Sequence, residues 1–216
     1  MKKLFAALLV LVLLAACGTP APTTTEDTTA KLPAPVNTEA TYKNKDEQEV
    51  ACELTNYTNA CAAINVSNLH EYLGRDDVLY IDLRDYSDYA SKHLRNFEVI
   101  PYFAYIFNAE AGTNPEKVQL FGGSVAEPVA AYEESVELLE VLFPKDKTIF
   151  LMCQSGGRVA QCMTLLDSLG WDMSKIYNVG GMGQYTAEEY APYTTNAAEF
   201  KVQATYSFEG LTPAAK

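Results

Sequence analysis

The residues best suited to chemistry lie together in the segment Cys153–Arg158, which reads Cys-Gln-Ser-Gly-Gly-Arg. A tight turn with two glycines can direct backbone N–H groups toward one point, and the N-terminus of a following helix adds positive polarity. Such a cradle favours the thiolate of a cysteine, which is its nucleophilic form. We therefore expect Cys153 to be a nucleophile rather than a buried core thiol. The residues expected to form an anion-binding loop around it are Gln154, Ser155, Gly156, Gly157 and Arg158.

The flanking sequence predicts the elements that hold this segment, which we call the Cys153 loop (residues 153–158). An apolar, β-prone run at residues 148–152 precedes the cysteine, and apolar residues at helical spacing follow the loop. We therefore predict a strand, a tight turn and a helix that Gly170 ends. Cys162 lies on the apolar face of this helix, where a core thiol is favoured over a resolving cysteine for Cys153.

Two further strands are predicted at residues 78–81 and 176–179. Because open α/β sheets form their sites at the carboxyl ends of strands, Asp82 and Cys153 are expected on one rim. We interpret Asp82 and Arg84 as an ion pair that supports this rim. The alternation of strand and helix patterns predicts an α/β fold, with a parallel sheet that helices cover on both faces.

The Cys153 loop resembles the active-site loop of rhodanese-like sulfurtransferase domains, whose pattern is Cys, any residue, Ser or Ala, Gly, any residue, Arg. Other segments between about residues 65 and 185 resemble motifs of this family in the same order: Asp82-Leu83-Arg84, His93-Leu94, Ile100-Pro101 and Val179-Gly180-Gly181. The sequence departs from the family pattern around the histidine, with Lys92 before it and Arg95-Asn96-Phe97 after it. His93 is interpreted as a packed turn residue rather than a general base.

The resemblance implies a single rhodanese-like α/β domain that transfers sulfane sulfur through a persulfide on Cys153. Its partners would be a small sulfur-containing substrate and a thiol or cyanide acceptor, with no cofactor and no metal. Two alternatives remain open. One is a phosphatase-like or arsenate reductase-like enzyme, although such loops resemble Cys-x5-Arg and the spacing here is Cys-x4-Arg. The other is a rhodanese-like module that binds a partner or small anion without catalysis.

The N-terminus has the features of an export signal. Lys2-Lys3 precedes an apolar run at residues 4–14, which is too short to span a membrane and ends in small residues. Leu14-Ala15-Ala16-Cys17 resembles the bacterial lipobox. This resemblance implies that residues 1–16 are removed and that lipidated Cys17 anchors the protein to a membrane, facing the cell surface or the periplasm. An ordinary secretory signal with a chance cysteine is the alternative.

The remaining chain is divided by composition. Residues 17–46 are rich in Thr, Pro and Ala and poor in large apolar residues, so we expect a flexible stalk. The domain is expected at residues 47–200 with a C-terminal tail at residues 201–216, and residues 200–208 alternate like an edge strand or a packed tail. A long connection at about residues 103–130 is interpreted as a partly ordered insertion that covers the rim.

Charge limits the partners of the mature protein. Without Lys2 and Lys3 the chain keeps 14 basic and 28 acidic residues, which gives a net charge of −14. This balance disfavours nucleic acid and an electrostatic attachment to anionic lipid. Membrane attachment is therefore expected through the lipid on Cys17.

Cys52 and Cys61 are expected to form a disulfide. They lie in a polar segment of a chain that we expect to be exported, and such a bridge would close a small loop. Two free thiols are the alternative, and a metal site is disfavoured because no Cys-x-x-Cys or histidine lies nearby. Between this pair and the first strand, a capping signal at Ser67 or Asn68 predicts a short helix over residues 65–74.

Overall fold

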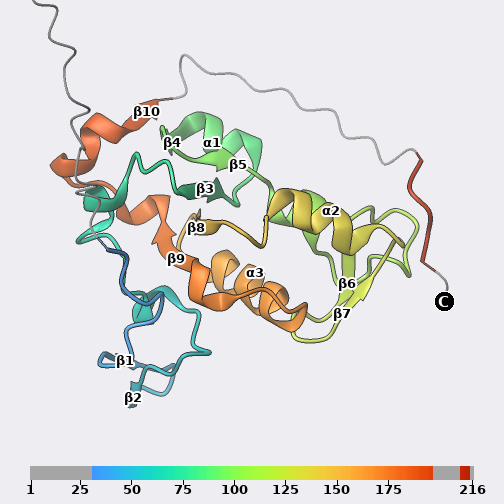
Figure 1. The fold of residues 1–216 in the computed structure, drawn as a ribbon, viewed down its shortest axis with the longest axis horizontal. Coiled ribbons are helices and arrows are strands. Elements are labelled where there is room, and N and C mark those ends of the chain that lie inside the picture. Colours follow the sequence, from blue (N-terminus) through green and yellow to red (C-terminus); the bar gives the residue numbers. More distant parts are fainter. Residues whose placement is uncertain (1–30, 197–209, 215–216) are drawn as a thin grey trace, which may run out of the picture. The chain divides into compact units, whose positions relative to one another are not determined.

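A four-stranded parallel sheet lies at the centre of the domain, with strand order β5-β3-β8-β9 (Figure 1). The computed structural model describes residues 31–196 and 210–214. The strands are β3 (Val78–Asp82), β5 (Glu98–Val99), β8 (Thr148–Cys153) and β9 (Ile176–Gly181). Every residue of β8 after Thr148 is buried, because both faces of the sheet are covered. The predicted parallel α/β domain is confirmed.

Side chains alternate along β8 between two hydrophobic cores. Ile149 and Leu151 point into a core that includes residues of α2 (Ser135–Leu142) and α3 (Gly157–Ser168). Phe150 and Met152 point into the second core, on the opposite face of the sheet. Near that core lies α1 (Tyr86–Ser91), and α1 and α3 flank the sheet from opposite sides (Figure 1). The strand and helix expected on either side of the Cys153 loop are therefore both present.

Short elements surround this framework. In the described part of the chain, antiparallel pairs are formed by β1 (Thr41–Lys43) with β2 (Glu49–Ala51), β4 (Lys92–Leu94) with β10 (Thr194–Asn196), and β6 (Phe121–Gly123) with β7 (Pro128–Ala130). Turns of 3₁₀ helix lie at Asn59–Cys61, Leu69–Tyr72, Met173–Lys175, Met182–Gln184 and Glu188–Tyr193.

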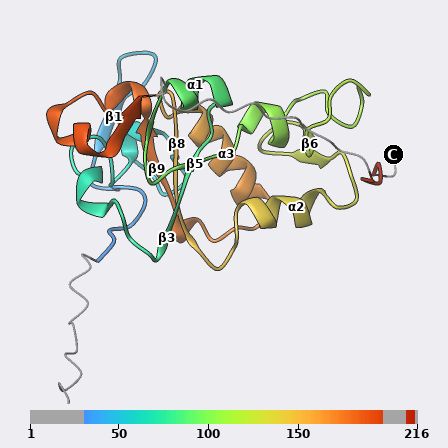
Figure 2. The same cartoon turned by 90° about the horizontal axis from the view of Figure 1, so that it is seen from above.

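The predicted insertion has its own secondary structure. It begins with a π-helical segment at Tyr102–Ile106 and continues to the β6–β7 hairpin, which lies beside α2 in both views (Figures 1 and 2). The backbone N–H of Leu120 donates to the carbonyl of Tyr105, and the buried Ser135 hydroxyl of α2 donates to the carbonyl of Leu120. These hydrogen bonds fix the insertion against the domain.

The expected boundary of the stalk at residue 46 is wrong. Val36 is buried and pairs with Ala62, and the Tyr177 hydroxyl of β9 donates to the carbonyl of Pro33 at 2.7 Å. The polar composition of residues 31–46 concealed these contacts, because a segment can pack through a few residues and its backbone. The predicted signal at residues 1–16 and the first part of the stalk at residues 17–30, which includes Cys17, lie outside the described residues.

The helix predicted over residues 65–74 is also reduced, to the 3₁₀ turn at Leu69–Tyr72. The side chain of Asn68 does not cap it. That amide accepts from the N–H of Asn65 and donates to the carbonyl of Ala63 instead. Asn68 thus satisfies the preceding loop, which is the usual competition between polar side chains and helix formation.

The C-terminal tail is described over residues 210–214, and residues 197–209 lie outside the described part. The N–H of Ala214 donates to the carbonyl of Ala131, and the N–H of Thr212 donates to the carboxylate of Glu134. This end of the tail therefore packs beside the start of α2. Among residues 31–196 and 210–214, no helix combines the length and apolar character needed to cross a membrane.

Candidate functional site

Cys153 is the last residue of β8, and the Cys153 loop turns from that strand into α3. Cys153 is 2% exposed and belongs to the first hydrophobic core, so it is buried, contrary to the expectation that it is not a core thiol. Gln154, Ser155 and Gly157 lie at the surface. The backbone N–H of Gly156 points back at the thiol and donates to Sγ at 3.1 Å. The loop therefore places a backbone hydrogen-bond donor on the sulfur that the sequence analysis predicts to be a nucleophile.

Gly156 is required at its position for two reasons. Its φ is +92°, in the left-handed region that side chains other than glycine rarely adopt. A Cβ atom at this position would also lie 2.8 Å from both Cβ and Cγ of Asn59. Backbone angle and available space therefore both demand glycine at the residue that donates to Cys153.

The end of β9 lies directly against the Cys153 loop. A Cβ atom on Gly181 would overlap the backbone of Gln154 and Ser155. The N–H of Gly183 donates to the carbonyl of Gln154 at 3.1 Å, and the N–H of Gly181 donates to the side chain of Gln184. The glycine at 181 thus allows the two backbones to meet, which gives the late Gly-Gly turn a physical role.

Arg158 connects the loop to β3 and to the insertion. Its Nη1 donates to the carbonyl of Leu83 at 3.0 Å, and its guanidinium carbon lies 5.1 Å from the centroid of the Phe103 ring. The first contact fixes the side chain at the carboxyl end of β3, and the second is a cation–π contact. Arg158 therefore holds its charge beside the Cys153 loop through groups outside the loop.

Asp82 and Arg84 form a buried ion pair at the same end of the sheet. Nη2 of Arg84 lies 2.7 Å from Oδ2 of Asp82, and Nε donates to both carboxylate oxygens at 3.0 Å. Arg84 also donates to the carbonyls of Lys92 and Asp88, so the pair ties β3 to α1 and β4. Burial raises the pKa of the Asp82 carboxyl, and the neighbouring guanidinium opposes that rise. The residue between the two, Leu83, carries the carbonyl that binds Arg158.

The remaining candidates have structural surroundings. His93 is buried, with Nδ1 2.8 Å from the carbonyl of Tyr89 and its ring stacked on the Tyr89 ring, and burial lowers its pKa. Cys162 is fully buried in the core, and burial together with the neighbouring Cys153 raises its pKa. Both therefore have the packed positions that the sequence favoured for them.

Sequence reasoning missed Asn178, a polar residue within buried β9. Its side-chain amide donates to the carbonyls of Tyr57 at 2.7 Å and Gly156 at 3.2 Å, and its oxygen accepts from the N–H of Gly180. An asparagine inside an apolar strand must find such partners, so its position alone was a usable signal. Asn59 and the carbonyl of Leu83 were also missed, and neither carries a comparable signal.

Cys52 and Cys61 are joined by a disulfide, with their Cα atoms 5.6 Å apart. We call the segment that it closes the disulfide loop (residues 52–61). Within the described part of the chain, no three His, Cys, Asp or Glu side chains are grouped in a way that could hold a metal ion.

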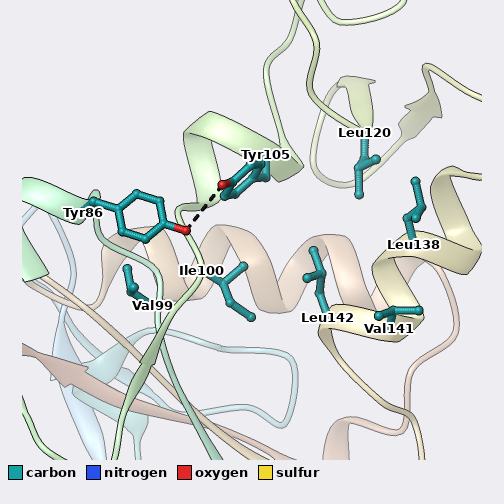
Figure 3. Close-up of a pocket in the computed structure, with 8 residues that line it drawn as sticks. All are labelled: Tyr86, Val99, Ile100, Tyr105, Leu120, Leu138, Val141 and Leu142. Atoms are coloured by element: carbon teal, nitrogen blue, oxygen red, sulfur yellow. Dashed lines mark hydrogen bonds between the residues drawn. The ribbon is translucent and has the colours of Figure 1, made fainter. Parts of the chain in front are cut away.

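A separate apolar pocket of about 320 Å³ lies between the insertion, α2 and the start of α1 (Figure 3). Its polar groups include the hydroxyls of Tyr86 and Tyr105, whose oxygens are 3.4 Å apart. The full lining is Tyr86, Val99, Ile100, Tyr105, Leu120, Leu138, Val141 and Leu142. No residue of the Cys153 loop is among them and none is charged, so this pocket is unsuited to the anion chemistry of Cys153.

Comparison with known families gives a match to a family described as the rhodanese-like domain, over residues 65–188. This range includes the Cys153 loop, the Asp82–Arg84 pair and the glycines at the end of β9. It leaves out the disulfide loop. No curated protein matches the chain.

The solved structures to which the chain is similar are distant from it in sequence. The rhodanese-like domain of an Anabaena protein is 14% identical, with 70% of this chain and 92% of that chain covered and a TM-score of 0.40. A rhodanese-like domain protein from Staphylococcus aureus is 20% identical, covering 58% and 91% at a TM-score of 0.36. A rhodanese from E. coli solved with anions is 17% identical, covering 55% and 98% at a TM-score of 0.32. The family assignment rests on the match over residues 65–188.

The ion pair of Asp82 and Arg84 generates a stability prediction. Asp82→Asn removes one charge and leaves the buried guanidinium of Arg84 unpaired, so we expect the free energy of unfolding to fall by about 3–5 kcal/mol. Urea denaturation followed by circular dichroism measures this change. The matched control is Glu140→Gln, which breaks the exposed pair with Lys145 and should cost less than about 1 kcal/mol. Equal effects of the two substitutions would contradict the supporting role of the buried pair.

Proposed function

The chain belongs to the rhodanese-like domain family, and we propose that it is a sulfurtransferase that carries sulfane sulfur on Cys153. The observation that carries the proposal is the position of the thiol. It lies at a strand-to-helix turn with the N–H of Gly156 on its sulfur, in a loop that has the family's spacing from cysteine to arginine. Such a donor stabilises negative charge on sulfur, which a thiolate nucleophile and a persulfide both require.

The proposed reaction has two half-reactions. The Cys153 thiolate attacks the outer sulfur of a donor such as thiosulfate, so that a bond forms between Sγ and this sulfur. The sulfur–sulfur bond of the donor breaks, and its electron pair leaves with sulfite. In the second half-reaction an acceptor such as cyanide attacks the terminal sulfur, and the electron pair of the persulfide bond returns to Sγ as thiolate. Thiocyanate leaves, and the enzyme is regenerated without an external oxidant or reductant.

The chain would contribute electrostatics rather than proton transfer. Loop amides can stabilise the negative terminal sulfur of the persulfide, and the charge of Arg158 lies beside the same loop. No general base is needed when the nucleophile is already a thiolate. This fits the position of His93, whose Nδ1 lies against the carbonyl of Tyr89.

Phosphatase-like chemistry is less well supported. Such enzymes place an arginine at the end of a longer loop, where its guanidinium can bind a tetrahedral oxyanion. Here the loop is one residue shorter, and Nη1 of Arg158 donates to the carbonyl of Leu83. A non-catalytic module is the other outcome that the experiments below distinguish.

We further propose that the domain is exported and lipid-anchored through Cys17. The lipobox-like sequence supports this location, as does the disulfide between Cys52 and Cys61, because such bonds persist in oxidising compartments. The acidic character of the chain leaves the lipid as the means of attachment.

Initial-rate kinetics test the transferase proposal. With thiosulfate and cyanide varied together, the wild-type chain should give parallel double-reciprocal lines, as expected for transfer through a covalent enzyme intermediate. Cys153→Ala should abolish transfer. Arg158→Ala should keep the nucleophile and lose at most roughly 2–4 kcal/mol of transition-state stabilisation. Cys162→Ala is the matched control, because it removes the other free thiol and should still transfer sulfur.

Each remaining outcome of these assays assigns a different function. Transfer by Cys153→Ala at the wild-type rate would contradict the role of Cys153. Hydrolysis of a phosphate ester by the wild-type chain, lost in Cys153→Ala and without sulfur transfer, would establish the phosphatase alternative. A folded wild-type chain with neither activity would contradict both enzymatic hypotheses with these substrates and favour the binding module.

Fractionation of bacterial cells tests the anchor. The wild-type chain should sediment with membranes and release its lipid-modified N-terminal peptide on digestion. Cys17→Ser should block lipidation and leave unprocessed precursor or released protein. A wild-type chain recovered in the soluble fraction without lipid would contradict the proposal.

A further inference from the structure

The disulfide loop lies outside the region that matches the family, which begins at residue 65, yet it contacts the Cys153 loop. Both of its cysteines are buried, and its last residues form the 3₁₀ turn Asn59–Cys61. Because the disulfide joins its two ends, the loop has a restricted set of conformations. A constrained segment of this kind can hold a neighbouring loop in place.

The first contact between the two loops is at Gly156. The side chain of Asn59 occupies the space next to the Gly156 Cα, on the side where other residues would carry Cβ. Asn59 also donates weakly to the side chain of Gln184, at 3.5 Å. Gln184 in turn accepts from the N–H of Gly181, whose backbone touches the Cys153 loop. The side chain of Asn59 thus packs between Gly156 and the turn that follows β9.

The second contact uses one buried amide for both loops. The Nδ2 atom of Asn178 donates to the carbonyl of Tyr57 in the disulfide loop and to the carbonyl of Gly156 in the Cys153 loop. The hydroxyl of Tyr57 also donates to Asp167 in the last turn of α3, at 2.9 Å. The disulfide loop is therefore attached at both ends of the helix that follows the Cys153 loop.

These contacts converge on Gly156, the residue whose N–H donates to Cys153 Sγ. Gly156 adopts a left-handed backbone conformation, and its N–H is the donor to Cys153 Sγ. Glycine is the most conformationally permissive residue, so a loop with glycine at both 156 and 157 needs outside support to keep one conformation. Asn59 supports the Cα side of Gly156, and Asn178 binds its carbonyl.

From these contacts we infer that the disulfide loop is a buttress for the Cys153 loop, with Asn59 as a positioning residue for the Gly156 N–H. The inference rests on the proposed function, because the positioned group is the one that would stabilise the thiolate and the persulfide. Asn59 itself does not touch the reacting sulfur. Its contribution passes through the backbone of Gly156.

Hydrogen exchange tests the buttress without reference to activity. In Asn59→Ala, and in the double variant Cys52→Ser/Cys61→Ser, amides in a peptide covering residues 153–158 should exchange at least about tenfold faster than in the wild-type chain. A peptide covering α2 should be unchanged. Leu54→Ala is the matched control, because Leu54 lies in the same loop and is 69% exposed. It should leave both peptides unchanged.

Kinetics and a double-mutant cycle then connect the buttress to sulfur transfer. Asn59→Ala should lower kcat by about tenfold and change KM by less than about twofold, because the interaction that it supports is strongest in the transition state. Gly156→Ala should lower kcat/KM in both backgrounds, but the fold-loss should be at least about threefold smaller in an Asn59→Gly background than in the wild-type background. The reason is that the side chain that the new Cβ would meet is then absent. Equal losses in the two backgrounds would contradict the contact between Asn59 and Gly156.

The outcomes separate the inference from the proposed function. A wild-type chain without sulfur transfer contradicts the proposed function, and the exchange comparison still decides the buttress. If the wild-type chain is active, the buttress is contradicted when Asn59→Ala and the double variant Cys52→Ser/Cys61→Ser both keep the wild-type exchange rates at residues 153–158 and the wild-type kcat. Should the serine variant fail to fold, Asn59→Ala decides alone, because it keeps the disulfide.

Discussion

The site depends on the backbone conformation of Gly156. Its N–H donates to the Cys153 sulfur, and its positive φ then turns the chain into α3 at a point where a side chain would meet Asn59. Parallel strand β8 delivers the cysteine to the carboxyl end of the sheet, and α3 begins one residue after Gly156. The hydrogen bond that reaches the Cys153 sulfur therefore comes from a backbone group.

Three supports hold this turn from different directions. The end of β9 packs its glycine backbone against Gln154 and Ser155. The carbonyl of Leu83, between the two residues of the buried ion pair, binds Arg158. The disulfide loop contacts Gly156 through Asn59 and shares the amide of Asn178 with it. The first two supports lie within the region that matches the family. The third comes largely from the disulfide loop, which precedes that region in the sequence.

The central fold could be predicted from sequence because its information is local. Residues 78–81, 148–152 and 176–179 are apolar β-prone runs, and the pattern after the Cys153 loop has the period of a helix. The contacts that support the Cys153 loop were harder to predict from the sequence. The carbonyl of Leu83 acts through backbone, which residue type does not encode, and Asn59 meets Gly156 only in the folded chain. Residues 31–46 differ from the predicted stalk because a few contacts, such as the hydrogen bond from Tyr177 to Pro33, fix this segment. Residues 65–74 differ from the predicted helix because the side chain of Asn68 bonds to the backbone of the preceding loop.

The central claim is that Cys153 carries the sulfur, and intact-mass spectrometry tests it most directly. After incubation with thiosulfate and removal of excess donor, the wild-type chain should gain about 32 Da, the mass of one sulfur atom, and lose it again on addition of cyanide. Cys153→Ala should gain nothing, whereas Cys162→Ala should behave like the wild-type chain. An equal gain on Cys153→Ala, or sulfur transfer by a wild-type chain that never gains this mass, would contradict the account.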